Sequence, residues 1–374
     1  MRGQWLGKIS GEIEGTLRLE LEERDGGFSG HAYIFYDPQQ QLPGFKYQIN
    51  LPKDPPHIAE VETIYLYPAG GEMTREHCQG AEQMLIERFD EATPVSLKVV
   101  FALNDNELEV IWTATDGQIG SSLLTRSDIN GDSLLVKRAD LTTWDKFREW
   151  AVDQKPRRYI FRGQSDPKKL ASSFYRTRRN DLAYWIAQDV KILFGALIEQ
   201  VSYPLVLGNL EHNAAIWSLL QHHGYPTPLL DWTFSPFVAA YFAFQNVESD
   251  QTADPRIFIF DQAAWSEKYG LVTIIADASR PQMIVLESLT VGNPRSGPQQ
   301  SLSTVANVAD IEAFVREREQ EDCKTYLTVC DLQASARPKI MRELELMGIT
   351  YGSLFPGLDG ICRDIRDRLF AEPS

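Results

Sequence analysis

A chain of 374 residues is longer than one hydrophobic core usually organises, so its length predicts two domains. Its content of 43% hydrophobic and 24% charged residues is that of an ordinary globular protein. The formal net charge of −15 disfavours binding to nucleic acid, because such binding depends mainly on neutralising phosphates.

No apolar run is long enough to predict a membrane span, and the first residues, MRGQWLGKISGEIEG, become polar too early for a signal peptide. We therefore expect a cytoplasmic protein without a membrane partner. The 4 cysteines are scattered without a CxxC pair, which argues against a zinc site and against a disulfide framework.

Residues 1–126 alternate polar and apolar side chains with a period of two, most clearly over residues 16–21, 31–35 and 96–101. This pattern predicts half-buried antiparallel strands. Glycines punctuate the runs, and Asn104, Asp105 and Asn106 lie between two of them, where a hairpin would turn. The predicted fold of this region is a small β-sandwich or barrel that recognises a ligand or a protein trigger.

Two further features of this region carry less information. Thr74 can cap a helix that would continue through residues 83–86, although Gly80 weakens it. His31, His57 and His77 are dispersed, so they predict surface or hydrogen-bonded histidines rather than a metal site.

Residues 127–141 lose the alternating pattern and are predicted to link the first domain to a second one over residues 142–370. A helix begins near Thr142 or Thr143, either of which can serve as the N-cap. The strand predicted over residues 158–161 then delivers Arg162, Gly163 and Gln164 at its end. A guanidinium beside a glycine suits an anion, although a purely structural arginine is an open alternative.

Helical spacing of apolar residues predicts an amphipathic helix over residues 182–198 and another over residues 213–220. The second helix continues into Gln221, His222 and His223, and Gly224 ends it. The basic residues at positions 176, 178 and 179 suit a solvated helix start or an anion contact.

A cluster of polar residues follows, between a short buried strand at residues 229–230 and an apolar helix over residues 237–244. Asp231, Trp232, Thr233 and Ser235 are predicted at this strand-to-helix junction, with Pro236 in the first helical turn. Helix N-terminal amides can bind an anion there, but Thr233 or Ser235 can equally be a simple cap.

Four ordered blocks of sequence resemble the FRG domain family over about residues 145–370. They are FRGQ at 161–164, LASSFYR at 170–176, QHHGYPTPLLDWTFSP at 221–236, and the pair formed by residues 348–349 and 354–360. The resemblance implies that the second domain is an α+β FRG domain. It leaves the amino-terminal β region unexplained.

The order of these blocks is also distantly similar to that of ADP-ribosyltransferases, which implies a split β-sheet with an NAD-binding cleft. Under that resemblance NAD would be a substrate, no metal would be needed, and the setting would be a toxin or antiphage effector. The implied catalytic residues are Arg162, His222 and Glu287. The implied ligand-binding residues are Gly163, Gln164, Gln221, Asp231, Trp232, Thr233, Ser235, Gln299 and Gln300.

Three alternatives stay open at this stage. The same cleft can bind a nucleotide or a peptide terminus without turnover, or the polar cluster can be purely structural. A nuclease is the weakest hypothesis, since no compact group of metal-binding carboxylates is visible.

Overall fold

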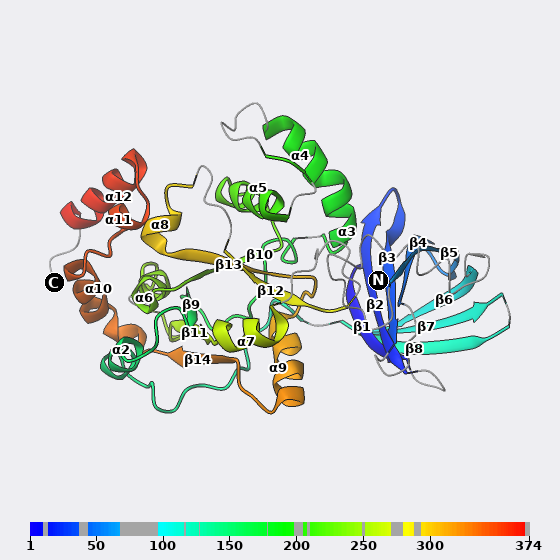
Figure 1. The fold of residues 1–374 in the computed structure, drawn as a ribbon, viewed down its shortest axis with the longest axis horizontal. Helices are drawn as coiled ribbons and strands as arrows, with labels where there is room; N and C mark the ends of the chain where they lie inside the picture. The colour runs from blue at the N-terminus through cyan, green and yellow to red at the C-terminus, as the bar shows by residue number, and fades with distance from the viewer. Residues whose placement is uncertain are drawn as a thin grey trace.

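The computed structural model describes residues 1–9, 14–36, 44–67, 96–115, 117–126, 128–177, 179–197, 205–207, 210–248, 251–270, 280–287 and 293–370. The molecule is elongated, with a β-barrel at one end and the C-terminal helices at the other (Figure 1). The helix predicted from Thr74, together with His77, lies outside the described residues.

The amino-terminal region is a closed antiparallel barrel of eight strands, so of the two predicted β architectures the barrel is confirmed. Its strands are β1 (Gly3–Ile9), β2 (Gly15–Arg24), β3 (Gly27–Tyr36), β4 (Gly44–Pro52), β5 (His57–Tyr67), β6 (Ser96–Asn104), β7 (Glu107–Ala114) and β8 (Ile119–Thr125). Strand β8 returns to β1, where Leu6 faces Thr125 and closes the barrel. The predicted hairpin is present between β6 and β7, with Asp105 at φ 51° in its turn.

Strand β2 is buried on both faces, whereas its alternating pattern predicts a half-buried strand. Leu17, Leu19 and Leu21 point into the barrel core, as the alternation predicts. The outward-facing residues Arg18, Glu20 and Glu22 are nevertheless buried, with exposed fractions of 2%, 0% and 2%. The rest of the chain covers this face of the barrel, so its charges lie between the two parts of the molecule.

The second part of the chain begins with α2 (Trp144–Val152), which Thr143 caps as predicted. The next elements are β9 (Ile160–Gln164), α3 (Leu182–Tyr184), a π-helical turn over Trp185–Asp189, α4 (Val190–Leu197), α5 (Leu210–His222), β10 (Leu229–Thr233), α6 (Pro236–Phe244), β11 (Arg256–Phe260) and α7 (Gln262–Tyr269). The chain continues with β12 (Met283–Leu286), α8 (Ser296–Gln299), β13 (Ser301–Ala306), α9 (Ile311–Asp322), β14 (Leu327–Asp331), a 3₁₀ turn over Ala334–Ala336, α10 (Arg337–Leu346), α11 (Tyr351–Leu354) and α12 (Leu358–Leu369).

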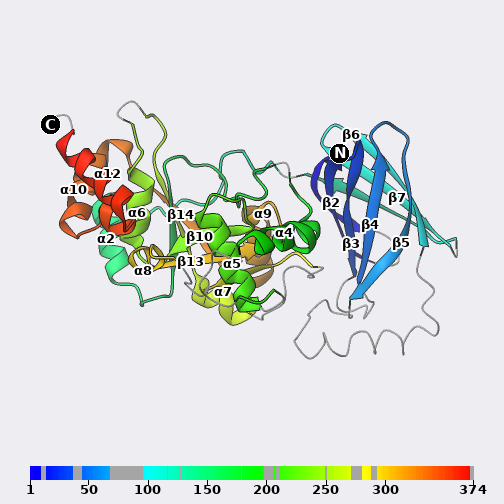
Figure 2. The same ribbon diagram turned by 90° about the horizontal axis from the view of Figure 1, so that it is seen from above.

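A six-stranded sheet in the order β12-β13-β10-β9-β11-β14 forms the centre of this part (Figures 1 and 2). On one face, α7 and α9 pack on a single core that contains Trp232, Phe258 and Phe260. On the other face the helices form two separate cores. Helices α2, α6 and α10 cover β9 and β11, whereas α5 and the α3–α4 segment cover β10, β12 and β13.

Two element boundaries differ from the sequence predictions. Asp231, Trp232 and Thr233 belong to strand β10 rather than to a loop after it, because pairing with β13 continues through residue 233. Arg162–Gln164 likewise lie within β9, where they pair with β11. Short strands take their ends from partner strands, which local sequence does not reveal. In the described part of the chain, no helix is long and apolar enough to cross a membrane.

Gly163 sets the distance between β9 and helix α6. A Cβ atom at this position would lie 1.9 Å from the carbonyl oxygen of Ala239 and 2.6 Å from the amide nitrogen of Ala243. The helix backbone therefore packs directly on the strand backbone, and glycine alone fits between them.

We predict that Gly163→Ala lowers the free energy of unfolding by about 1–3 kcal/mol, since it forces α6 away from the sheet. Gly195→Ala is the matched control, because Gly195 lies within α4 with open space around its Cα and alanine favours helix. Urea unfolding of both variants checks this, and equal stability of Gly163→Ala and wild type would contradict the packing argument.

Candidate functional site

A cavity of about 530 Å³ opens on the sheet between the two helix-covered cores. Its floor includes two cross-strand pairs of polar residues, Asp231 with Ser303 and Thr233 with Ser301. These residues occupy positions where the alternation of β10 and β13 would otherwise place apolar side chains under the helices. The cavity therefore results from a polar gap in the apolar face of the sheet.

The cavity also lies where strands β9 and β10 diverge. The two strands are in register at a single position, Phe161 with Thr233, whereas β9 pairs with β11 over five positions. Arg162 bridges the gap, since its Nη1 donates a 2.7 Å hydrogen bond to the main-chain carbonyl of Asp231. Its Nε donates to the Gln164 side chain at 3.4 Å, and Gln164 in turn donates to the carbonyl of Lys168 at 2.9 Å.

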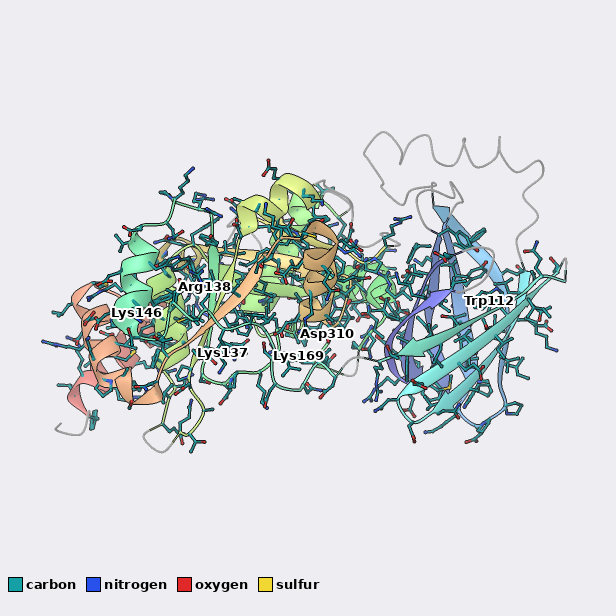
Figure 3. The ribbon with its side chains drawn as sticks, turned by 90° about the horizontal axis from the view of Figure 1, so that it is seen from below. Trp112, Lys137, Arg138, Lys146, Lys169 and Asp310 are labelled. Atoms are coloured by element: carbon teal, nitrogen blue, oxygen red, sulfur yellow. The ribbon has the colours of Figure 1, made fainter. Side chains whose placement is uncertain are left out.

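Cationic side chains predominate in the lining of the cavity, although the chain as a whole is acidic. They are Arg162, Lys168, Lys169, Arg176 and Arg295, against two carboxylates, Asp166 and Asp231. The lysines form ion pairs with carboxylates that do not line the cavity. Lys169, for example, pairs with Asp310 at a distance of 2.9 Å (Figure 3). Among the described residues no ion pair with a carboxylate is found for Arg162, Arg176 or Arg295; Arg162 bonds a main-chain carbonyl and Arg295 lies over the Phe355 ring. Such a lining suits an anionic ligand.

Burial lowers the pKa of Arg162, and the nearby charge of Arg176 contributes in the same direction, while Asp231 opposes it. Arginine remains protonated despite such a shift, because its ordinary pKa exceeds 12. Two guanidinium groups thus lie within electrostatic range of each other on one cavity wall. An anion placed between them would relieve this repulsion.

Asp231 presents its carboxylate to the cavity and is held from one side. Gln221 donates to its Oδ2 at 2.5 Å and accepts from the hydroxyl of Thr227 at 2.5 Å, while Ser303 approaches its Oδ1 at 3.5 Å. The carboxylate is exposed. It is therefore oriented without being neutralised by a cation, and it can interact with a ligand hydroxyl or a developing positive charge.

His222 lies at the end of α5 on the cavity wall, where its Nε2 contacts the side-chain amide of Asn293. Burial lowers the pKa of His222, Arg295 and His223 lower it further, and Asp231 partly compensates. The imidazole is consequently neutral near pH 7, the state in which it can accept a proton.

Three predicted site residues have structural roles, although one of them, Thr233, also lines the cavity. Thr233 donates to the carbonyl of Gln299 at 2.6 Å and accepts from the amide of Ser235, and Ser235 is the N-cap of α6. The capping alternative is thereby confirmed for Ser235. Gln300 adopts the left-handed conformation that ends α8, with φ 45°, and is not among the cavity-lining residues.

The remaining predicted residues are placed as follows. Gln299 lines the cavity and donates to the carbonyl of Leu354 at 3.0 Å. Trp232 contributes to the lining, but its indole donates to Thr304 and packs with Phe260 on the other face of the sheet. Glu287 pairs with Arg157 in an exposed ion pair and does not line the cavity.

The structure adds residues that the sequence did not assign to the site. The sequence predicts Arg176 as an anion contact, whereas it assigns no site role to Arg295, Ser303 or Phe355, all of which line the cavity. Phe355 stacks on Tyr351 with a centroid distance of 4.3 Å, and the Arg295 guanidinium lies 5.1 Å from the Phe355 ring centroid. A signal for Ser303 is the alternation of serine with leucine over positions 301–303.

Comparison with known families gives one result for this region. Residues 157–252 match the FRG domain. The matched FRG segment contains β9, α5, β10 and α6, and thus Arg162 and Asp231, whereas Arg295 and Phe355 come from the chain beyond it. No curated protein matches the chain significantly. The similarity to ADP-ribosyltransferases stays a prediction.

No cluster of three or more histidine, cysteine, aspartate or glutamate residues able to hold a metal ion is present in the described ranges. The groups that line the cavity include guanidinium and ammonium groups, the carboxylates of Asp166 and Asp231, and the imidazole of His222.

The lowered pKa of His222 leads to a prediction about stability. The unfolded chain binds a proton at this histidine near pH 6.5, whereas the folded chain binds it only at a lower pH. Stability is thus lost as the pH falls from about 6.5 through the folded-state pKa. We predict that His222→Gln loses less stability than wild type between about pH 7 and pH 5. Parallel urea titrations measure this, and identical pH profiles would contradict it.

Proposed function

We propose that the cavity binds a nucleotide of the NAD type. The observation that carries the proposal is the convergence of Arg162, Arg176 and Arg295, which lack carboxylate partners in the described chain, on one cavity with an oriented carboxylate. Guanidinium groups bind phosphate oxygens through two parallel hydrogen bonds. Phe355, which is half-buried and lines the cavity, offers an apolar surface for a ring.

The FRG match supports a common site at β9 and β10, because it spans both strands that diverge at the cavity. In this proposal Arg162 and Arg176 contact the phosphates, and Asp231 faces the ribose. Glu287 has no part in it, since its side chain pairs with Arg157 outside the cavity lining.

We further propose that the bound nucleotide is cleaved at its glycosidic bond, as in ADP-ribosyl transfer. Asp231 would stabilise the positive charge that develops on the ribose as the nicotinamide leaves, and His222 would accept the proton of the attacking group. The barrel would then serve as the part that binds a target or trigger, in the setting of a toxin or antiphage effector.

A binding module without turnover is the second candidate. The observation that favours it is that Asp231 and Asp166 are the two carboxylates lining the cavity, and Asp231 is already hydrogen-bonded to Gln221. A nucleotide held only by the arginines would be recognised but not cleaved.

Titration of NAD by calorimetry tests the binding proposal. Arg176→Ala and Arg295→Ala should each weaken binding about tenfold or more, since a hydrogen bond to a charged group contributes about 1.5–3 kcal/mol. Arg162→Ala should weaken binding as well, with some loss of stability, because Asp231 loses a hydrogen-bond donor. Arg342→Ala is the matched control, as Arg342 pairs with Glu345 at an exposed position on α10. Absence of NAD binding to the wild type would refute the proposal.

Release of nicotinamide from NAD, followed by chromatography, separates the two candidates. We predict that Asp231→Asn abolishes release while the Kd for NAD changes less than about threefold, since the amide keeps the shape but loses the charge. Binding by the wild type without any release would leave the binding module as the function.

A further inference from the structure

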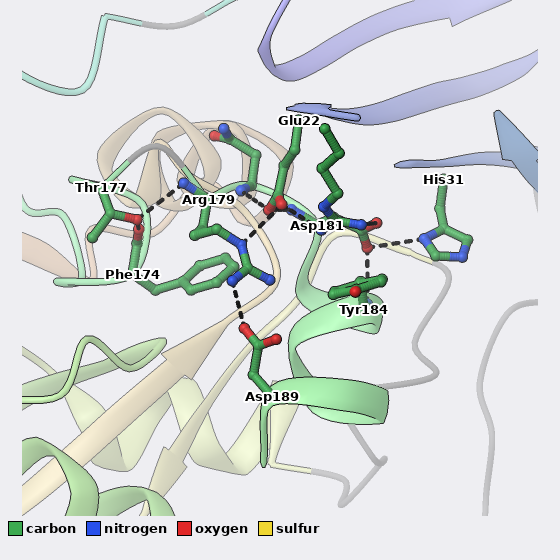
Figure 4. Close-up of polar contacts among 10 residues, drawn as sticks. Glu22, His31, Phe174, Thr177, Arg179, Asp181, Tyr184 and Asp189 are labelled. Carbon is green, nitrogen blue, oxygen red and sulfur yellow. Dashed lines mark hydrogen bonds and ion pairs between the residues drawn. The ribbon is translucent and has the colours of Figure 1, made fainter. Parts of the chain in front are cut away.

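The barrel forms hydrogen bonds to the chain segment that leads to the cavity wall. Glu22, on strand β2, accepts hydrogen bonds from the main-chain amides of Asn180 at 2.6 Å and Asp181 at 2.8 Å (Figure 4). Its second carboxylate oxygen accepts from Nε of Arg179 at 2.8 Å. The Glu22 side chain is 3% exposed, so these bonds are shielded from water.

Residues 179–181 form further contacts, both with the barrel and with the second part of the chain. Asp181 caps helix α3 by accepting from the amide of Tyr184 at 2.9 Å, and Nδ1 of His31 on the barrel lies 2.9 Å from the same carboxylate (Figure 4). Arg179 also pairs with Asp189 at 2.5 Å. Moving residues 179–181 away from the barrel would break these bonds and leave the buried Glu22 carboxylate unpaired, which would be costly.

This segment connects directly to the cavity. Arg176 lines the cavity, and its neighbour Tyr175 is buried against the barrel. Burial raises the pKa of Tyr175 well above its ordinary value, the charge of Glu20 raises it further, and Arg18 opposes the shift. Tyr175 thus faces the barrel, and the next residue, Arg176, faces the cavity. Arg176 is three positions from Arg179, which donates to Glu22.

The barrel also forms hydrogen bonds beside the cavity floor. Strand β13 contributes Ser301 and Ser303 to the cavity and ends at Ala306. Immediately after it, Gln4 of the barrel donates to the carbonyl of Asn307 at 2.8 Å and accepts from the amide of Ala309 at 2.7 Å. Gln4 is 5% exposed.

We propose that Glu22 and Gln4 are positioning residues for the cavity, through which the barrel holds Arg176 and strand β13 in their ligand-binding arrangement. Displacing the barrel would release Arg176 from its place near Arg162 and weaken the anion-binding wall. Binding events at the barrel and in the cavity are then coupled through residues 175–181. The effect on ligand affinity rests on the proposed nucleotide site, whereas the positioning itself does not.

The decisive variant is Glu22→Gln, which keeps the size of the side chain but removes its charge. Glu23→Gln is the matched control, since the adjacent Glu23 points away and pairs with Lys53 at an exposed position. Should Glu22→Gln fail to fold, Arg179→Gln removes the side-chain bond to Glu22 and leaves the barrel sequence intact.

Hydrogen exchange without ligand tests the positioning. Peptides covering residues 170–181 should exchange at least tenfold faster in Glu22→Gln than in wild type or Glu23→Gln. Unchanged exchange would overturn the proposal, whether or not the wild type binds NAD.

A double-mutant cycle on NAD affinity tests the coupling. Glu22→Gln should raise the Kd about tenfold in the wild-type background and less than about twofold in the Arg176→Ala background, because the same contact is then already lost. Equal effects in both backgrounds would show a general loss of structure and would overturn the positioning role. If the wild type binds no NAD, the proposed function fails, and the exchange result alone decides the positioning role.

Discussion

The divergence of strands β9 and β10 is the constraint on which the rest of this structure depends. Gly163 allows helix α6 to lie directly on β9, while β10 follows β13 along its whole length. On the face of the sheet that these helices cover, β9 therefore packs in the core that contains α6, whereas β10 packs in the core that contains α5. The Arg162 side chain supplies a hydrogen bond to the Asp231 carbonyl, which the neighbouring strand does not bond in the region of the gap.

This arrangement explains why an acidic chain contains a cation-rich cavity. The polar gap leaves a cavity between the two apolar cores, and the cationic side chains that line it would lie within contact distance of a ligand bound there. The long-range field of the acidic surface does not determine what the cavity binds, since exposed charges are screened over about 10 Å at physiological salt. Local charge and shape determine it.

The barrel and the sheet meet through charged residues rather than through an apolar surface. Arg18 and Glu20 lie 3.3 Å apart and are almost completely buried, and burial raises the pKa of Glu20 while Arg18 opposes the shift. A buried polar contact of this kind contributes little net stability but strongly disfavours other arrangements of the two parts. This specificity is what lets the barrel orient the cavity wall.

The sequence by itself determined the α+β class, the strand pattern of the barrel region and the caps or ends of α2, α5 and α6. Period-two alternation and residues such as Thr143, Gly224 and Ser235 act locally, through backbone conformation and nearby amides. It also predicted Arg162 and Asp231 as site residues, and both line the same cavity.

Only the tertiary structure decided that β10 continues through Thr233, that Glu287 lies outside the cavity, and that Arg295 and Phe355 line it. Those facts depend on strand pairing and helix packing between residues far apart in the chain, and period-two alternation cannot say which neighbour will cover a strand. The charged face of β2 is the clearest case, because its alternation predicts a face in water and the second part of the molecule buries it.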